Sequence, residues 1–112
     1  MDRGKVVYIA GPIAGVPEYY KPFEHMEDAL TGWGFVALTP TRLPQGLTVA
    51  AYMRIDMAMM DTADAVVFLP GWQHSKGATL EHEYCKYTGK PHMHFDGGAF
   101  KPVREFLGGI FA

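Results

Sequence analysis

The sequence has one cysteine, no long apolar run and no cluster of like charges. Cys85 has no second cysteine with which to form an internal disulfide, so we expect a fold stabilised by its core in a reducing, cytoplasmic location. No apolar run approaches the ~18 residues of a membrane-spanning helix. The first four residues lead into a strand and do not resemble a signal peptide. We therefore expect no membrane association.

The charges are nearly balanced, with ten Lys and Arg against twelve Asp and Glu and a net charge of −2. Basic residues are scattered and no acidic tail is present, so a nucleic-acid polymer is not an expected partner. The length of 112 residues fits a single domain over residues 1–112. Hydrophobic residues make up 48% of the chain, which is a large apolar content for so small a domain. This excess indicates a surface that binds a partner.

Short apolar runs alternate along the chain with segments of helical periodicity. Strands are predicted at 5–10, 35–38, 65–69 and 92–95, and helices at about 23–33, 48–61 and 78–88. A short amphipathic segment at 103–107 precedes a glycine-rich tail. Such alternation produces βαβ units with right-handed crossovers. We expect an α/β fold, a small doubly wound parallel sheet of flavodoxin or Rossmann type with four to five strands flanked by helices.

Ligands of such sheets bind beyond the carboxyl ends of the strands. The loop after the first strand is similar to a phosphate or ribose cradle, although it is not the dinucleotide fingerprint. The loop after the third strand precedes a helix N-terminus that could bind an anion, although Ser75 there also fits a simple helix cap. The candidate ligand-binding residues of these two loops are Gly11, Pro12, Ile13, Gly15, Trp72, Ser75 and Gly77.

Helical spacing directs two carboxylates toward the interior. Arg54 and Glu83 are expected on the solvent sides of their helices. Asp56 lies roughly 200° around its helix from Arg54, and Glu81 lies roughly 200° around its helix from Glu83. The expected neighbours of Asp56 are Val49, Tyr52, Met53 and Met60, and those of Glu81 are Ala78, Cys85 and Thr88.

A carboxylate on a buried face is costly unless it is paired or functional. In a structural interpretation, the helix dipole stabilises Glu81, and Asp56 accepts a hydrogen bond from an amide or a tyrosine. In a functional one, both line a pocket in which their pKa values are pushed apart, so that one is ionised and the other protonated near neutrality. Glycosidic-bond cleavage requires such a pair.

The histidines and the cysteine do not match a metal signature. His92 and His94 share one face of a strand, and His82 lies beside Glu83 on a helix, but no spacing fits a zinc motif. We expect neither a metal nor another cofactor. Cys85 follows Glu81 by one helical turn, a position that raises the pKa of a thiol, and we interpret it as a packing residue.

The helix predicted from Thr48 to Asp61 has almost no polar side. A helix that is apolar nearly all round is expected to be buried on both faces. One face can cover the sheet, and the other requires either the chain's own loops or a second protein surface. Because the helix is rich in methionine, which suits adaptable contacts, we favour a homodimer through residues 48–61.

Several segments follow one another in the order found in one superfamily. They are Tyr8-Ile9-Ala10-Gly11-Pro12-Ile13-Ala14-Gly15, Asp56, Asp64-Ala65-Val66-Val67, Leu69-Pro70-Gly71-Trp72-x-x-Ser75-x-Gly77-Ala78-x-x-Glu81 and Gly89-Lys90-Pro91. From about Val6 to Phe95 the chain resembles the nucleoside 2-deoxyribosyltransferase-like superfamily, and within it a small family common in phages and bacteria. The element from Ser75 to Glu81 is the most specific part of this resemblance.

The resemblance implies a role for several residues. Glu81 takes the place of the nucleophile that attacks C1′, and Asp56 that of the Asp that assists protonation of the leaving base. Asp64 matches an Asp that precedes the third strand in the superfamily and has a structural role there. Ser75 stands where the transferases carry an Asp, and where related deoxynucleoside 5′-monophosphate N-hydrolases carry a Ser that contacts the 5′-phosphate. A stacking partner for the base would come from Tyr8, Tyr19, Tyr20 or Trp72.

Two departures from the superfamily pattern narrow the expected function. The first-loop Ser and Arg of the hydrolases are replaced by Pro12 and Ala14, which leaves Lys76 or Arg42 to contact a phosphate. The transferases complete each site with an Asn from a neighbouring subunit, and this chain contains no Asn. We therefore expect a retaining N-glycosidase, a hydrolase that acts on a nucleoside or a nucleoside 5′-monophosphate. The alternatives are a non-catalytic module that binds or sequesters a nucleotide, a deoxyribosyltransferase and a purely structural protein.

Overall fold

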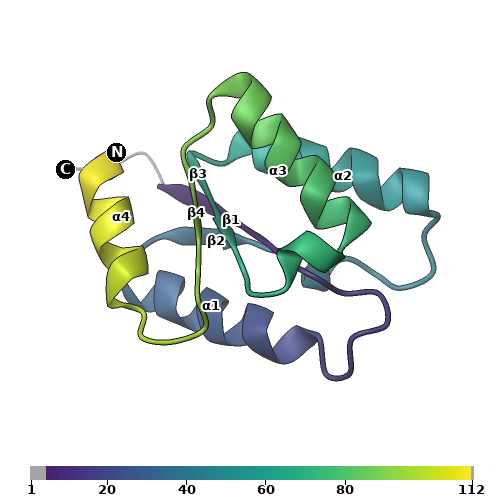
Figure 1. Cartoon of the computed structure of the whole chain (residues 1–112), viewed down its shortest axis with the longest axis horizontal. Helices are drawn as coiled ribbons and strands as arrows, with labels where there is room; N and C mark the ends of the chain where they lie inside the picture. The colour runs from purple at the N-terminus through teal and green to yellow at the C-terminus, as the bar shows by residue number, and fades with distance from the viewer. Residues whose placement is uncertain (1–4, 112) are drawn as a thin grey trace.

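The computed structural model describes residues 5–111, and these form one layer of parallel strands between two layers of helices (Figure 1). The strands are β1 (Val6–Ala10), β2 (Val36–Leu38), β3 (Ala65–Phe68) and β4 (His92–His94), in the order β2-β1-β3-β4. All three strand pairings are parallel. The α/β fold class predicted from the sequence is confirmed, and the strand order is that of a small flavodoxin-like sheet.

The two central strands form the middle of the protein. Every residue of β3 is buried, as are four of the five residues of β1. Such continuous apolar runs are typical of strands covered on both faces. The edge strands β2 and β4 have three residues each and are partly exposed. The sheet therefore separates two cores, one on each face.

Helices α1 (Tyr20–Gly32) and α4 (Lys101–Phe111) cover one face, and α2 (Val49–Thr62) and α3 (Lys76–Thr88) cover the other. On the first face, Phe23, Met26 and Leu30 of α1 pack with alternate residues of β1 and β3. The second core is smaller and contains Tyr8, Phe68, Met60 and Cys85. Helices on both faces confirm that the sheet is doubly wound.

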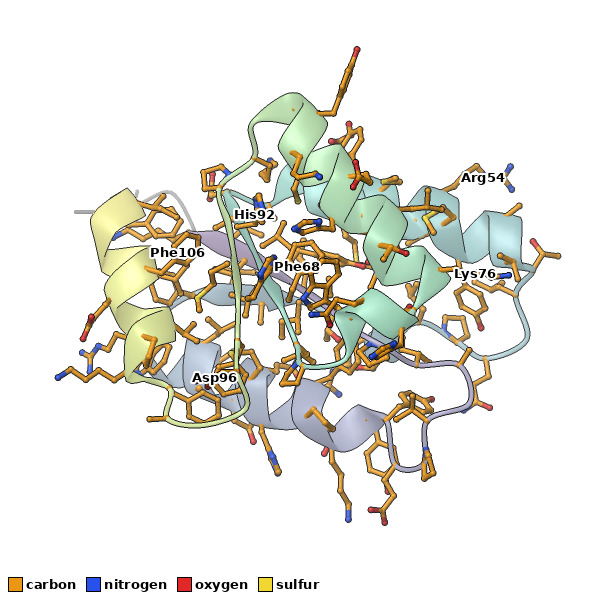
Figure 2. The ribbon with its side chains drawn as sticks, in the orientation of Figure 1. Arg54, Phe68, Lys76, His92, Asp96 and Phe106 are labelled. Carbon is orange, nitrogen blue, oxygen red and sulfur yellow. The ribbon has the colours of Figure 1, made fainter. Side chains whose placement is uncertain are left out.

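The C-terminal helix α4 is longer than the segment predicted at 103–107, and it continues through Gly108 and Gly109. The predicted end at 107 is wrong, although two glycines follow it. Tertiary packing outweighs their low helix propensity, since Val103 and Leu107 are buried and Phe106 and Ile110 pack against the first core. Figure 2 shows Phe106 directed from α4 toward the sheet.

The start of α3 also differs from the prediction, because the helix begins at Lys76 and not at Ala78. The Ser75 hydroxyl accepts a hydrogen bond from the Ala78 amide at 3.2 Å, which is the geometry of an N-cap. A short 3-10 helix, η2 (Trp72–His74), lies in the preceding loop, and another, η1 (Pro40–Arg42), follows β2. Within residues 5–111, no helix has the length and apolar character needed to cross a membrane.

Candidate active site

Glu81 lies on the inner face of α3, against the central strand β1. Its side chain is only 4% exposed and accepts a hydrogen bond of 2.6 Å from the Tyr8 hydroxyl. Ala78 and Cys85, one turn away on either side, are also buried. The inward orientation predicted from helical spacing is therefore confirmed, and a strand tyrosine fixes one oxygen of the carboxyl group.

Asp56 lies on α2, next to the same region of the sheet, and is half-buried. Its Oδ1 atom is buried and has no hydrogen-bond partner within the described part of the chain. An unpaired buried carboxylate oxygen lowers the stability of the fold by about 1–3 kcal/mol or more. A ligand that donates a hydrogen bond to this atom would remove that cost. Of its expected neighbours, Met60 is buried, but Val49 is 84% exposed and that expectation was wrong. Val49 is the first residue of α2, where the helix has not yet reached the sheet.

The pKa values of both carboxyl groups are raised toward neutrality. Burial raises the pKa of Asp56 to about 6. Burial also raises the pKa of Glu81, to about 7; the hydrogen bond from Tyr8 opposes this rise and the charge of Asp56 adds to it. Asp56 and Glu81 come from two helices that pack together on β1 through Met60, Cys85 and Tyr8, and we treat the two carboxyl groups as one candidate site. This site titrates near pH 7, where one group can be ionised while the other is protonated.

Tyr8 positions Glu81 and is not a stacking surface. It is fully buried, so its ring offers no free face to a base, and in this respect the sequence-based expectation was wrong. Burial, together with the charges of Glu81 and Asp56, raises the pKa of its phenol far above the usual range. The hydroxyl therefore remains protonated and continues to donate to Glu81. Nothing in the sequence pairs Tyr8 with Glu81, because β1 is a continuous apolar run and the two residues are far apart in the chain.

The loop after β1 brings the predicted residues Gly11, Pro12, Ile13 and Gly15 to the carboxyl end of the sheet. Ile13 packs against the first core, and Pro12 lies beside Gly71 of the loop after β3. The Ile13 carbonyl accepts a hydrogen bond from the Val16 amide at 3.2 Å, and Gly15 in this turn has φ +74°. A turn of this kind requires a positive φ at its third residue, and this requirement accounts for a glycine at position 15. The two loops therefore meet at the end of β1 and β3.

Gly11 is required by close packing, and we expect Gly11→Ala to destabilise the protein. A methyl group there would lie 3.0 Å from Leu69 Cβ and 3.2 Å from Phe23 Cζ, both of which belong to fully packed side chains. The expected loss in free energy of unfolding is about 1–3 kcal/mol. Urea unfolding should show a lower midpoint at unchanged slope. Gly32→Ala, where an added methyl meets nothing within 4 Å, is the control and should not lower the midpoint.

The loop after β3 places Trp72, Ser75 and Gly77 near the amino end of α3. Ser75 caps the helix, as one of the two interpretations predicted. Gly77 lies close to Met53 of α2, since a methyl group there would be 3.6 Å from its Cε atom. Lys76 is exposed at the first turn of α3 and is the available cation for an anionic group.

Arg42 was the other cation considered for a phosphate, and it is engaged elsewhere. Its guanidinium contacts Glu27 of α1 through bonds of 2.6 and 3.2 Å. This bidentate pairing raises the pKa of Arg42 further above its ordinary value. Within the described residues, the pairing leaves Lys76 as the stronger of the two candidates.

Two residues near the site have structural roles. The Asp64 carboxylate accepts a hydrogen bond of 3.0 Å from the Val6 amide and so joins the starts of β1 and β3. Cys85 is fully buried and its sulfur lies 3.8 Å from that of Met60. Burial and the neighbouring Glu81 raise the pKa of the Cys85 thiol to about 11. Both findings agree with the sequence interpretation, and Cys85 is not an activated nucleophile.

The carboxyl pair does not lie in either of two clear hollows of the surface. One hollow is at the amino end of the sheet, between residues 61–64 and 88–91. The other lies between α1 and the loop after β4, and its lining includes His25, Pro70 and Phe95. Asp56 and Glu81 line neither. The candidate site is therefore defined by the contacts of its two carboxyl groups and not by either of these hollows.

The structure also gathers three histidines that sequence spacing did not bring together. His82 of α3 lies next to His92 and His94 of β4, and Phe68 is in ring contact with all three. Trp72 packs on the same cluster, with its ring centroid 4.2 Å from that of His82. Figure 2 shows Phe68 near the middle of the protein, beside His92. Burial and neighbouring imidazoles lower the pKa values of His82 and His94.

The fold and the carboxyl pair together define a small parallel α/β domain with a candidate catalytic site beside β1, at the point where strand order reverses. Residues 5–94 match the family described as a domain of unknown function, DUF4406, and the chain belongs to that family because the match covers most of its length. A comparison with curated proteins gave no match.

Proposed function

We propose that this protein cleaves the N-glycosidic bond of a nucleoside or nucleoside 5′-monophosphate, with Glu81 as nucleophile and Asp56 as acid. The observation that carries the proposal is the pair itself. Glu81 is buried and oriented by Tyr8, and Asp56 beside it has a buried oxygen without a partner. Both carboxyl groups titrate near neutrality, as the paired roles of a retaining glycosidase require, but in the unliganded protein the pKa of Glu81, about 7, is higher than that of Asp56, about 6.

The reaction proceeds in two steps. A Glu81 carboxylate oxygen forms a bond to C1′ of the sugar while the bond from C1′ to the base nitrogen breaks. The electron pair of that bond leaves with the base, which takes the proton of Asp56. A water molecule then attacks C1′, giving its proton to the Asp56 carboxylate, and the bond between C1′ and Glu81 breaks. The product sugar retains its configuration, and both carboxyl groups return to their starting state.

This mechanism needs the proton on Asp56 and the negative charge on Glu81. The Tyr8 hydrogen bond favours that distribution because a phenol donor stabilises the ionised carboxylate to which it points. Asp56 Oδ1 has no such donor within the described residues. The deeper burial of Glu81 acts in the opposite direction. We infer that substrate binding, which brings the electron-poor C1′ next to Glu81, completes the preference for an ionised nucleophile.

A 5′-phosphate would bind at the amino end of α3. This end offers free backbone amides and the exposed Lys76, and a helix N-terminus is a favourable site for an anion. Ser75 is positioned there as well, as its resemblance to the phosphate-binding Ser of the N-hydrolases suggests. Because the chain contains no Asn to complete a transferase site, we propose water and not a second base as the acceptor.

The test is a panel of ribo- and deoxynucleosides and their 5′-monophosphates, with released base measured by chromatography. We expect base release from at least one deoxynucleoside or nucleoside 5′-monophosphate, and sugar rather than a new nucleoside as the other product. If no compound releases base, the proposal is wrong. Strong thermal stabilisation by a nucleotide that remains intact would instead support the binding module.

We also propose that a second copy of the chain covers α2 and closes the site. In one chain, Met60 is the only fully buried residue of α2, and Ile55 and Val49 are exposed together with Leu80 of α3. Within residues 5–111, the loop before α2 contacts Tyr52 through Pro44 and Leu47, but it leaves Ile55 and Val49 uncovered. A partner across α2 would enclose the surface next to Asp56.

Ile55→Glu is expected to produce a monomer. The introduced charge would have to be buried without a partner at the α2 surface, which opposes association. Size-exclusion chromatography with light scattering should give twice the 12.4 kDa chain mass for the wild type and one chain mass for the variant. Val36→Glu, at an exposed apolar position on β2, is the control and should remain a dimer. A monomeric wild-type protein would contradict this proposal.

A further inference from the structure

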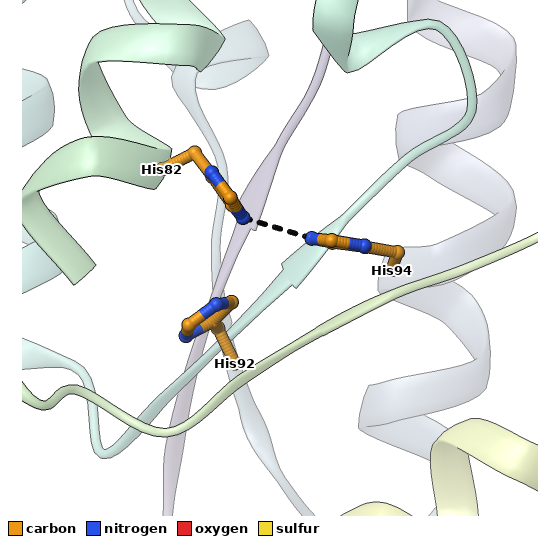
Figure 3. Close-up of side chains that lie close together, drawn as sticks. All are labelled: His82, His92 and His94. Atoms are coloured by element: carbon orange, nitrogen blue, oxygen red, sulfur yellow. Dashed lines mark hydrogen bonds between the residues drawn. The ribbon is translucent and has the colours of Figure 1, made fainter. Parts of the chain in front are cut away.

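Three imidazoles from two elements converge at the edge of the sheet, apart from the carboxyl pair. His82 extends from α3, and His92 and His94 extend from β4 (Figure 3). One nitrogen of each can be chosen so that all three lie within 4.8 Å of one another. The Nε2 atoms of His82 and His94 are 2.9 Å apart. Figure 3 shows His82 and His94 facing each other, with the ring of His92 beside them.

The fold itself produces this convergence. Residues two apart on a strand share a face, so His92 and His94 both project toward α3. In the sheet register they pair with Val66 and Phe68 of β3, which also belong to that face. The Phe68 and Trp72 rings pack against the imidazoles at centroid distances of 4.2 to 5.9 Å. These apolar rings support the imidazoles and limit their rotation.

The hydrogen bonding of His92 prepares one nitrogen as a ligand. Its Nδ1 lies 2.9 Å from the Lys90 carbonyl oxygen, and because a carbonyl only accepts, Nδ1 carries the proton. With the proton on Nδ1, Nε2 is the ring nitrogen whose lone pair can bind a metal. Donation from the second ring nitrogen to a backbone carbonyl is the arrangement that orients most metal-bound histidines. Simple aromatic packing does not require this orientation.

We propose that His82, His92 and His94 bind one divalent transition-metal ion, with Zn²⁺ as the principal candidate. Three imidazole nitrogens without a thiolate or carboxylate among them suit Zn²⁺, Cu²⁺ or Ni²⁺ and not Mg²⁺ or Ca²⁺. With zinc–nitrogen bonds of 2.0–2.1 Å, tetrahedral ligands lie about 3.3 Å apart. The His82 and His94 nitrogens would thus separate by a few tenths of an ångström as the ion replaces the proton between them. His94 is exposed, so the fourth position is open to water or a ligand.

The proposal is tested by isothermal titration of the full-length, tag-free protein with Zn²⁺ after removal of bound metal by a chelator. The wild type should bind one ion per chain. His94→Gln and His82→Gln should each weaken binding about tenfold or more, since loss of even a second-layer partner costs 10–100-fold. His25→Gln is the matched control, because His25 is an exposed histidine of α1 on the opposite face of the sheet. Its affinity should equal that of the wild type.

A second measurement locates the ion without relying on a variant's fold. The Trp72 ring packs, tilted, against two of the three imidazoles, so one equivalent of Cu²⁺ should quench its fluorescence in a saturable way when Trp33 is replaced by Phe. The proposal would be overturned if binding did not saturate or if the stoichiometry differed from one ion per chain. It would also be overturned if His94→Gln and His25→Gln bound Zn²⁺ with equal affinity. Glu81→Gln should bind Zn²⁺ like the wild type, so this site can fail or succeed independently of the proposed glycosidase.

Discussion

Replacing Glu81 by glutamine is expected to lower the rate of base release at least about 10³-fold. An amide cannot act as the nucleophile, although it preserves the size of the side chain and can still accept the Tyr8 hydrogen bond. Binding of an intact nucleotide should therefore survive. The rate is measured by chromatography of released base at saturating substrate, on the compound that the panel identifies.

Glu83→Gln provides the matched control for this experiment. Glu83 lies two residues from Glu81 on α3, but it is exposed and pairs with Lys86 at 3.1 Å. Its replacement should leave the rate unchanged. Asp56→Asn should cost about 10²–10⁴-fold, as expected for loss of a general acid. Equal rates of Glu81→Gln and the wild type would remove Glu81 from the mechanism.

The same Glu81→Gln substitution is expected to stabilise the protein, and increasingly so as pH rises. The folded-state pKa of Glu81 is about 7, above that of an unfolded chain, so between about pH 4.5 and 7 the folded state holds a proton that the unfolded state has released. Stability therefore falls as pH rises through this window. The loss reaches up to about 3 kcal/mol above pH 7 and is absent in the variant.

Urea unfolding at about pH 4 and pH 8 measures this effect. The free energy of unfolding of Glu81→Gln minus that of the wild type should be small at the lower pH and clearly positive at the higher one. Glu83→Gln, which changes an exposed carboxylate, should show no such trend. A difference independent of pH would mean that burial does not penalise the Glu81 charge. A stabilising change at a buried acid is the pattern expected where function and stability oppose each other.

Much of the fold was predictable because local patterns and tertiary structure agree in the central strands. Residues 65–68 are a continuous apolar run, and this run becomes the fully buried β3. The spacing of Glu81 from Glu83 correctly directed Glu81 inward, since angle around a helix is a local property. The end of α4 was not predictable from its glycines, because burial of Val103 and Leu107 determines it.

The parts of the site that sequence did not reveal are contacts between distant residues. Tyr8 and Glu81 are 73 positions apart, and His82 meets His94 only through the packing of α3 on β4. No local period encodes either contact. The apolar character of α2 follows from its sequence, and in the single chain Ile55 and Val49 are exposed, so burial of that face by a second copy stays a prediction.

The central claim, a covalent bond between Glu81 and C1′, is tested most directly by the configuration of the product formed in methanol. Methanol competes with water for the intermediate, and proton NMR of the methyl glycoside identifies the anomer. The proposed mechanism predicts the same configuration at C1′ as in the substrate, because two displacements occur in succession. A methyl glycoside of inverted configuration would show direct attack by the acceptor and would contradict a Glu81 nucleophile.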